Sequence, residues 1–325
     1  MSATSEALRG TIALTQRKKL VFMPDLALPA SAQLAVSLTT YSERIGFMDR
    51  LQIFKDIAAQ AGRGELTFPT NVNASLKLQQ ALDNPDCHID AAAKLVMADP
   101  LLSARTVAIA NSAAYNRSGN EITNVKVAVS RLGFRTLKSL VASVIVRQLD
   151  SKITNPQLKA KAAQLWEHSA HVSALAQVIA KHVTKVDPDT AMFAGIVHEI
   201  GGFYLLSRAE EFPGLLDGDP ENWIEYGEKL IGRGVLKKLG VPDTVMEAVE
   251  ALWHGISAIP PETLGDTLLL ANDLARVGSP LNEVNDVSAK RMAANINFDI
   301  EESTLQNVLD EYDEEINTLT AALMT

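Results

Sequence analysis

The stretch Ala191–Leu206, AMFAGIVHEIGGFYLL, constrains the fold of this chain more than any other. An apolar run leads directly into the polar pair His198 and Glu199, and then into Gly201 and Gly202. An apolar run of this kind belongs in a protein core, where an imidazole beside a carboxylate is costly to bury unless each has a hydrogen-bond, ionic or metal partner. The fold must therefore bring partners to His198 and Glu199 from elsewhere in the chain.

The segments around this stretch carry the signals of helices. Asp99-Pro100, Asn155-Pro156 and Asp187-Pro188 each place a capping side chain directly before a proline, which is the order typical of helix N-termini. Apolar residues also recur at helical spacing over residues 137–145 and 158–179. Because strand signals are almost absent, the sequence predicts an all-α, multi-helix protein.

Three expectations concern individual helices. The helix that begins at Pro188 should end at the glycine pair Gly201-Gly202, since glycine commonly terminates helices. A helix over residues 264–277 should hold Asp273 in its interior. His168 lies at the edge of the buried stripe of the helix that begins after Asn155, and His171 lies further round. A lone histidine at the edge of a buried stripe is more typical of a solvated or hydrogen-bonded structural residue than of a ligand.

The chain is predicted to have three parts. Residues 1–62 form an N-terminal arm followed by an amphipathic helix, residues 63–280 form the main helical domain, and residues 281–325 form an acidic helical tail. The tail holds ten acidic and two basic residues, which accounts for most of the net charge of −9. A body of little net charge argues against nucleic-acid binding as the main activity. The amphipathic helix is expected to pack on the main domain or to dock a partner, and the tail should dock on this subunit or another.

The sequence also indicates the compartment. No apolar run approaches the roughly 18 residues needed to cross a bilayer, and the N-terminal residues have no stretch typical of a signal peptide. The single cysteine, Cys87, excludes an intramolecular disulfide and fits a reducing environment. We therefore expect a cytoplasmic protein with no membrane insertion.

Seven segments follow one another in the order and spacing of a known helical family. They are FPTNVNASLKLQQALDNPD at 68–86, ADPLLSARTVAIANSAAY at 98–115, ITNVKVAVSRLGFRTLKSLVAS at 122–143, LWEHSAHVSALAQVIA at 165–180, AGIVHEIGGFYLL at 194–206, GRGVLKKLGVPDTVMEAV at 232–249 and LLLANDLARV at 268–277. Together they resemble the HDOD domain, a helical signalling module related to the HD and HD-GYP phosphohydrolases. The resemblance covers about two thirds of the chain and implies an HD-like fold with an added N-terminal segment and C-terminal helix.

The resemblance also implies a site. Catalytic HD relatives build a metal centre from a histidine on one helix, an adjacent His-Asp pair on a second helix and an aspartate on a later one. His168, His198 and Asp273 fall at three of these positions, while Glu199 replaces the aspartate of the pair. Two imidazoles and two carboxylates would suit a divalent Fe, Mn, Ni or Zn ion. Some relatives add a lysine shortly after the pair, where this chain has Gly202.

These departures predict a non-catalytic bacterial signal-transduction or scaffold protein. In it, the four groups of the vestigial pocket would satisfy one another, and no cofactor is expected. The expected partner is a signalling protein such as a response regulator, a kinase or a cyclic-dinucleotide enzyme, and a homo-oligomer is compatible with the sequence. Two alternatives stay open: a metal-dependent phosphohydrolase or phosphodiesterase with a His-Glu site, and a nucleotide sensor that binds without cleaving.

Overall fold

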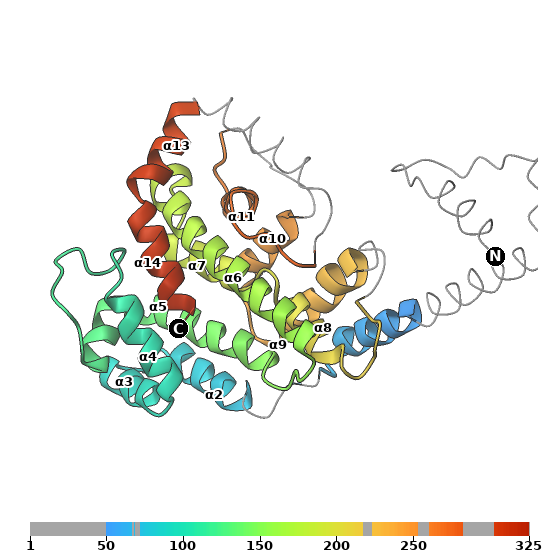
Figure 1. Ribbon diagram of the computed structural model, residues 1–325. Coiled ribbons are helices and arrows are strands. Elements are labelled where there is room, and N and C mark those ends of the chain that lie inside the picture. Colours follow the sequence, from blue (N-terminus) through green and yellow to red (C-terminus); the bar gives the residue numbers. More distant parts are fainter. Residues whose placement is uncertain are drawn as a thin grey trace, which may run out of the picture. The chain divides into compact units, whose positions relative to one another are not determined.

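A computed structural model describes residues 50–66, 68, 72–216, 223–252, 260–281 and 302–324, which belong to one compact unit, residues 49–325 (Figure 1). The predicted N-terminal arm lies outside these residues. Every regular element that the model describes is helical, which confirms the all-α prediction. The elements are a helix at residues 50–62, α2 Val72–Asp83, α3 Ile89–Met97, α4 Pro100–Ala110, α5 Val125–Leu149, α6 Pro156–Ile179, the π-helical turn η1 Ala180–Thr184, α7 Pro188–Val197, α8 Ile200–Arg208, the π-helical η2 Trp223–Gly232, α9 Arg233–Lys238, α10 Asp243–Ala251, α11 Leu264–Asp273, α13 Glu302–Glu311 and α14 Asp313–Met324.

The predicted helix starts are confirmed by their capping side chains. The Asn155 side chain accepts a hydrogen bond from the backbone N–H of Gln157 at 2.8 Å, and the Asp187 side chain accepts one from the backbone N–H of Thr190 at 2.8 Å. Each cap satisfies a backbone donor that the first turn of a helix leaves without an intrahelical partner. The proline in the next position supplies no such donor, so the two residues together fix where α6 and α7 begin.

Helix α6 lies at the centre of the unit and is covered by α7, α8, α11 and α14 (Figure 1). From Leu165 to Ala180 every residue except Glu167 is buried. Of the two settings expected for His168, solvated or hydrogen-bonded, the structure has the hydrogen-bonded one. Both His168 and His171 lie inside the protein. The reason is that neighbouring helices cover α6 on several sides, whereas an amphipathic stripe in the sequence predicts one covered side.

The central helix is shorter than the sequence predicts. Helix α7 ends at Val197, the chain turns at His198 and Glu199, and α8 begins at Ile200 and contains both glycines. The glycine pair is needed for close packing rather than for ending a helix. A Cβ atom on Gly201 would lie 2.7 Å from the backbone oxygen of Gly227 in η2, which is closer than real Cβ contacts allow.

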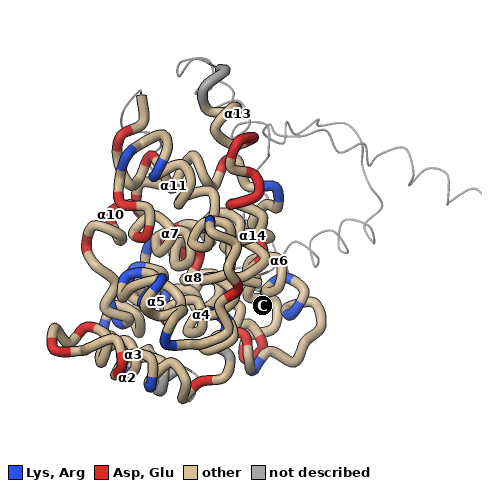
Figure 2. The backbone as a smooth tube through the Cα atoms, turned by 90° about the vertical axis from the view of Figure 1, so that its left-hand side faces the viewer, with Lys and Arg blue, Asp and Glu red and all other residues tan. Residues whose placement is uncertain are grey.

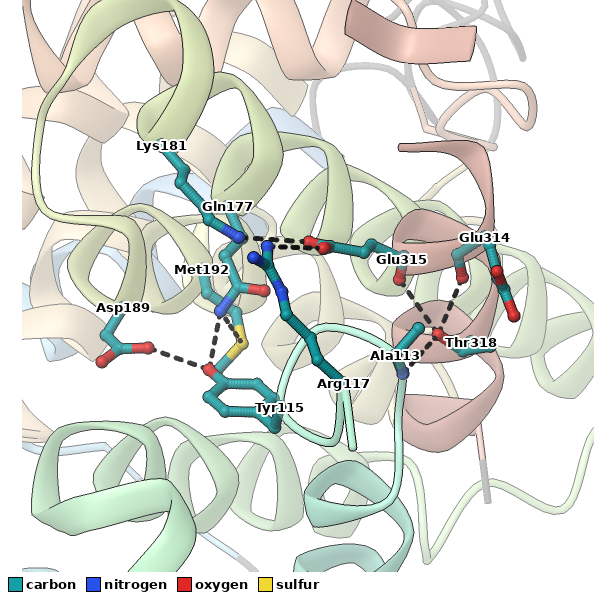
Figure 3. A network of polar contacts seen from close by, with 10 residues as sticks. All are labelled: Ala113, Tyr115, Arg117, Gln177, Lys181, Asp189, Met192, Glu314, Glu315 and Thr318. Atoms are coloured by element: carbon teal, nitrogen blue, oxygen red, sulfur yellow. Dashed lines mark hydrogen bonds and ion pairs between the residues drawn. The ribbon is translucent and has the colours of Figure 1, made fainter. Parts of the chain in front are cut away.

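The acidic tail folds back onto its own chain. It is divided into α13 and α14, and α14 packs against α6 and α4 (Figure 1). Figure 2 shows acidic residues gathered where α13 meets α14. One of them, Glu315, forms ion pairs with Arg117 at 3.0 Å and Lys181 at 3.4 Å (Figure 3). The tail is thus bound through its apolar side and through paired charges.

The helix at residues 50–62 also belongs to the core of this unit. Phe54 and Ile57 are buried in the same apolar cluster as the side chains of α6 and α8. Of the two roles expected for this helix, packing on the main domain is the one that the structure describes. No helix among the described residues combines the length and the apolar character needed to cross a membrane.

Candidate metal centre

Three of the four predicted site residues meet where α6 passes the turn between α7 and α8. His168 comes from the middle of α6, His198 is the residue that ends α7, and Glu199 follows it directly. Their ligand atoms all lie within 4.8 Å of one another. The residues are 2%, 8% and 4% exposed, respectively, so the cluster is buried.

A glycine allows the two helices to approach closely enough for this meeting. A Cβ atom at Gly195, on α7, would lie 2.5 Å from the Cα and 2.8 Å from the backbone nitrogen of Ser173, on α6. The Ser173 hydroxyl then donates a hydrogen bond to the backbone oxygen of Met192 at 2.8 Å. Because Gly195 lies one helical turn before His198, this close approach places the His198 ring against α6.

The hydrogen bonds of the two histidines fix where their protons lie. His168 Nδ1 lies 2.8 Å from the backbone oxygen of Val277, and His198 Nδ1 lies 2.8 Å from the backbone oxygen of Gly195. A carbonyl oxygen only accepts, so each Nδ1 carries a hydrogen and donates it. In a neutral imidazole the other nitrogen, Nε2, then carries no hydrogen and presents a lone pair. The two Nε2 atoms face each other at 3.2 Å.

Burial favours the neutral form of both rings. It lowers the pKa of His168, against the opposing effects of the Val277 carbonyl and the Asn272 side chain. Burial also lowers the pKa of His198 to about 3; His168 contributes to this shift and the Gly195 carbonyl opposes it. At neutral pH two lone pairs therefore point at each other, an arrangement that is repulsive unless a cation lies between them.

Glu199 adds a buried oxygen atom that, like the two Nε2 atoms, has no hydrogen-bond donor facing it in the part of the chain that the structure describes. Its Oε2 atom is buried and has no hydrogen-bond partner among the described residues. Burial raises the pKa of this carboxyl to about 7, and a hydrogen bond with Ser279 opposes that shift. A buried carboxylate oxygen without a partner is costly, so this group, like the two Nε2 atoms, is suited to a cation.

The fourth predicted residue, Asp273, lies outside this cluster. It is not in the interior of α11, as the sequence suggested, but is its last residue. Burial raises the pKa of its carboxyl to about 6, and the adjacent Asn272 side chain opposes the shift. Asn272 also acts on His168 by hydrogen bonding. An amide, rather than the predicted carboxylate, therefore interacts with the α6 histidine.

The three clustered residues fit a divalent transition-metal ion. Ligand histidines usually donate their second ring N–H to a carbonyl or carboxylate, as both rings do here. Two imidazoles and one carboxylate form a ligand set typical of Zn²⁺ and related ions. When bound, such an ion supplies a Lewis acid that polarises a phosphoryl oxygen or lowers the pKa of a water molecule. The predicted network of mutually satisfied groups does not describe Glu199, whose Oε2 has no such partner.

Comparison with known families identifies the fold. Residues 68–218 match the HDOD domain and residues 165–276 match the HD domain. The chain thus contains an HDOD domain over these residues, and the HD match contains His168, His198, Glu199 and Asp273. The resemblance to the HDOD family is confirmed.

Solved structures share this fold. A "Putative metal-dependent phosphohydrolase" from Shewanella amazonensis SB2B is 27% identical, with a TM-score of 0.61 over 85% of this chain and 99% of that one. An HDOD domain protein of unknown function from Geobacter sulfurreducens is 22% identical, with a TM-score of 0.53 over 85% and 98% of the two chains. A "Putative signal transduction protein" from Marinobacter aquaeolei VT8 is 18% identical, with a TM-score of 0.50 over 88% and 66%. No curated protein matches the chain significantly.

Proposed function

We propose that this HDOD protein is a signalling module that acts by binding a protein partner, and that its HD-type centre holds a divalent ion without turning over a phosphate ester. His168, His198 and Glu199 would be the ligands of the ion. The ion would join α6 to the turn between α7 and α8 and so hold the helical body in one arrangement. The output of the module would then come from its surface.

The observation that carries the proposal is the packing around Gly202. This residue occupies the position at which some HD relatives have a lysine. A Cβ atom here would lie 2.9 Å from Leu281 Cδ1, 3.0 Å from Leu165 Cδ2 and 3.3 Å from the Trp223 ring. Apolar side chains therefore fill the space that a cationic side chain would need. Phosphoryl transfer depends on positive groups that stabilise the developing charge, and the packing at this position excludes one of them.

A second candidate, a metal-dependent phosphohydrolase, is favoured by a different observation. The facing Nε2 atoms of His168 and His198 and the Glu199 Oε2 atom form a three-ligand set. Catalytic zinc sites commonly have three protein ligands and one open position. The similarity to the Shewanella amazonensis protein points the same way.

One set of experiments separates the two functions. The protein is purified without chelator, its metal content is measured, and phosphodiesters including cyclic dinucleotides are tested with Mn²⁺, Fe²⁺ and Ni²⁺. We expect bound metal in the wild type, loss of that metal in His198→Ala, and no turnover above the level of the variant. Affinity purification after crosslinking in the source cells should recover a partner protein in a constant molar ratio to this protein. Turnover that disappears in His198→Ala would instead establish the hydrolase.

A further inference from the structure

A basic groove lies between the helix at residues 50–62 and the segment η2–α9. It has a volume of about 580 Å³. Its cationic side chains are Lys55 on the first helix and Arg233, Lys237 and Lys238 on α9, and none of the described residues that line it is acidic. This charge is opposite to the net charge of −9 of the whole chain. The groove is therefore a local positive region on an acidic protein.

Small residues create the groove. A Cβ atom on Gly234 would lie 2.8 Å from the Cβ atom of Ala61, so the two helices touch where they cross. Ala58, Ala59 and Gly62 continue this low surface along the first helix. Because none of these residues has a long side chain, the crossing leaves a depression whose floor is mainly apolar.

Larger apolar side chains form one wall. Leu230, on η2, lines the groove and is 44% exposed. Tyr226, one turn earlier, is half-buried and stacks on Phe54 with ring centroids 6.4 Å apart. The stack fixes the Tyr226 ring at the edge of the groove. An exposed leucine beside a fixed aromatic ring is typical of a surface that receives apolar side chains of a partner.

The charges at the rim are available to a ligand. Lys55, Lys237 and Lys238 are exposed and form no ion pair with any residue that the structure describes. Arg233 is held in place by a 2.7 Å ion pair between its Nε and Glu250. Glu225, an acidic residue on η2, forms an ion pair with Lys229 at 3.2 Å rather than with the cations of the groove.

We propose that this groove is the docking site for an acidic amphipathic helix of the protein partner. The inference rests on the proposed signalling function and specifies the chemistry of its partner. An apolar floor with lysines from two separate helices suits a helix that presents apolar side chains at i, i+3, i+4 and i+7 and carboxylates beside them. A compact anion would engage the cations but would leave the Leu230 wall and the alanine floor uncovered.

The test uses the full chain and two synthetic probes. One is a fluorescein-labelled helical peptide of about 16 residues with leucines along one side and glutamates flanking them. The other has glutamine at every glutamate position. We expect saturable binding of the acidic peptide, affinity that falls with added salt, and binding at least about tenfold weaker for the glutamine peptide.

Two double variants locate the binding. Lys237→Glu with Lys238→Glu should weaken binding of the acidic peptide by about tenfold or more. Lys152→Glu with Lys159→Glu makes the same change of net charge at exposed positions outside the groove, and we expect it to bind within about twofold of the wild type after correction for long-range charge effects. Thermal unfolding of both variants would establish that each is folded.

Several outcomes would overturn the groove assignment. They are no saturable binding up to about 1 mM peptide, equal binding of the two peptides, or equal loss in the two double variants. A concentration-dependent dimer that only Lys237→Glu with Lys238→Glu disrupts would assign the groove to a second copy of this chain instead. If crosslinking still recovers the partner with that variant, the groove is wrong and the signalling function stands. Turnover at the metal centre would reject the signalling function itself.

Discussion

The residue that most directly decides the geometry of the His168–His198–Glu199 cluster is Gly195, which has no side chain. Its lack of a side chain lets α7 lie against the Ser173 backbone, and this contact carries His198 to within 3.2 Å of His168. The two rings are then oriented by carbonyl groups rather than by charged residues. The chemistry of the cluster therefore depends on helix packing as much as on the ligands.

Gly195→Ala should destabilise the protein by about 3 kcal/mol, because the added methyl group meets Ser173 backbone atoms that cannot rotate away. The free energy of unfolding in urea measures this. Gly62→Ala is the control, since a Cβ atom there meets nothing within 4 Å, and its effect should be within about 0.5 kcal/mol. Equal stability of Gly195→Ala and the wild type would show that the two helices are not in close contact.

His171 should make the protein less stable in acid. Its Nδ1 accepts a hydrogen bond from the backbone N–H of Arg276 at 3.1 Å. Burial, followed by the charges of Arg276 and His168, lowers its pKa to about 4, while Asp313 opposes the shift. The ordinary value is about 6.5. Between these two values the unfolded chain binds more protons than the folded one, so the free energy of unfolding falls as the pH falls.

His171→Asn keeps an acceptor for the Arg276 N–H and removes the titrating group. From pH 7 to about pH 4.5, the variant should lose about 2 kcal/mol less stability than the wild type, after allowance for solvent screening. Urea unfolding at both pH values measures the difference. Parallel losses in the two proteins would mean that His171 does not titrate in this range.

At the scale of the helix, the tail is an integral part of the body. Leu319 and Leu323 on α14 are fully buried, and the Trp166 indole N–H of α6 donates a hydrogen bond to the Leu323 backbone oxygen at 3.3 Å. Ion pairs of Glu315 with Arg117 and Lys181 add to this contact (Figure 3). Partly exposed ion pairs contribute little, so the apolar side of α14 should dominate its attachment.

Leu319→Ala should therefore cost about 3 kcal/mol of stability, the usual range for a fully buried leucine. Glu315→Gln, which removes both ion pairs but no apolar surface, should cost about 1 kcal/mol or less. Thermal and urea unfolding of the two variants give the comparison. A larger loss for Glu315→Gln would mean that charge, rather than apolar burial, holds the tail.

Local signals in the sequence were enough to predict where helices begin, because a cap such as Asn155 acts on residues two and three positions away. They did not predict the end of α7. Gly201 is required by its close approach to the Gly227 backbone, which lies in a different element, and no local sequence pattern reports that contact. The burial of His171 was missed for the same reason, since α6 is covered on several sides by elements distant in sequence.

The site was predicted in part. The family resemblance selected His168, His198 and Glu199, which the structure brings together. It also selected Asp273, which lies outside the cluster, whereas the adjacent Asn272 forms a hydrogen bond with His168. The backbone oxygen of Val277, which orients His168, could not be predicted, because no side-chain motif marks a carbonyl group.

On the scale of the whole molecule, the proposed metal centre would join three parts of the fold: α6, the turn between α7 and α8, and the segment after α11 through the Val277 carbonyl. An ion bound there would add a further link between elements that otherwise meet through apolar packing and a few hydrogen bonds. Because a ligand that binds only the folded state stabilises it in proportion to its saturation, metal binding should be visible as a change in the stability of the entire unit.

Metal-free protein should therefore melt at a higher temperature when Mn²⁺, Fe²⁺, Ni²⁺ or Zn²⁺ is added. At 100 times the dissociation constant the gain is about 2.7 kcal/mol, which corresponds to a rise in Tm of about 4–8 °C for a unit of this size. His198→Ala and Glu199→Gln should abolish most of the rise, because each removes a ligand. His88→Ala, at an exposed histidine in a distant turn, should preserve it. A rise in Tm of equal size in all four proteins would place the stabilising ion elsewhere on the surface. If no metal raised the Tm of any of the four proteins, the facing Nε2 atoms of His168 and His198 would instead share a proton.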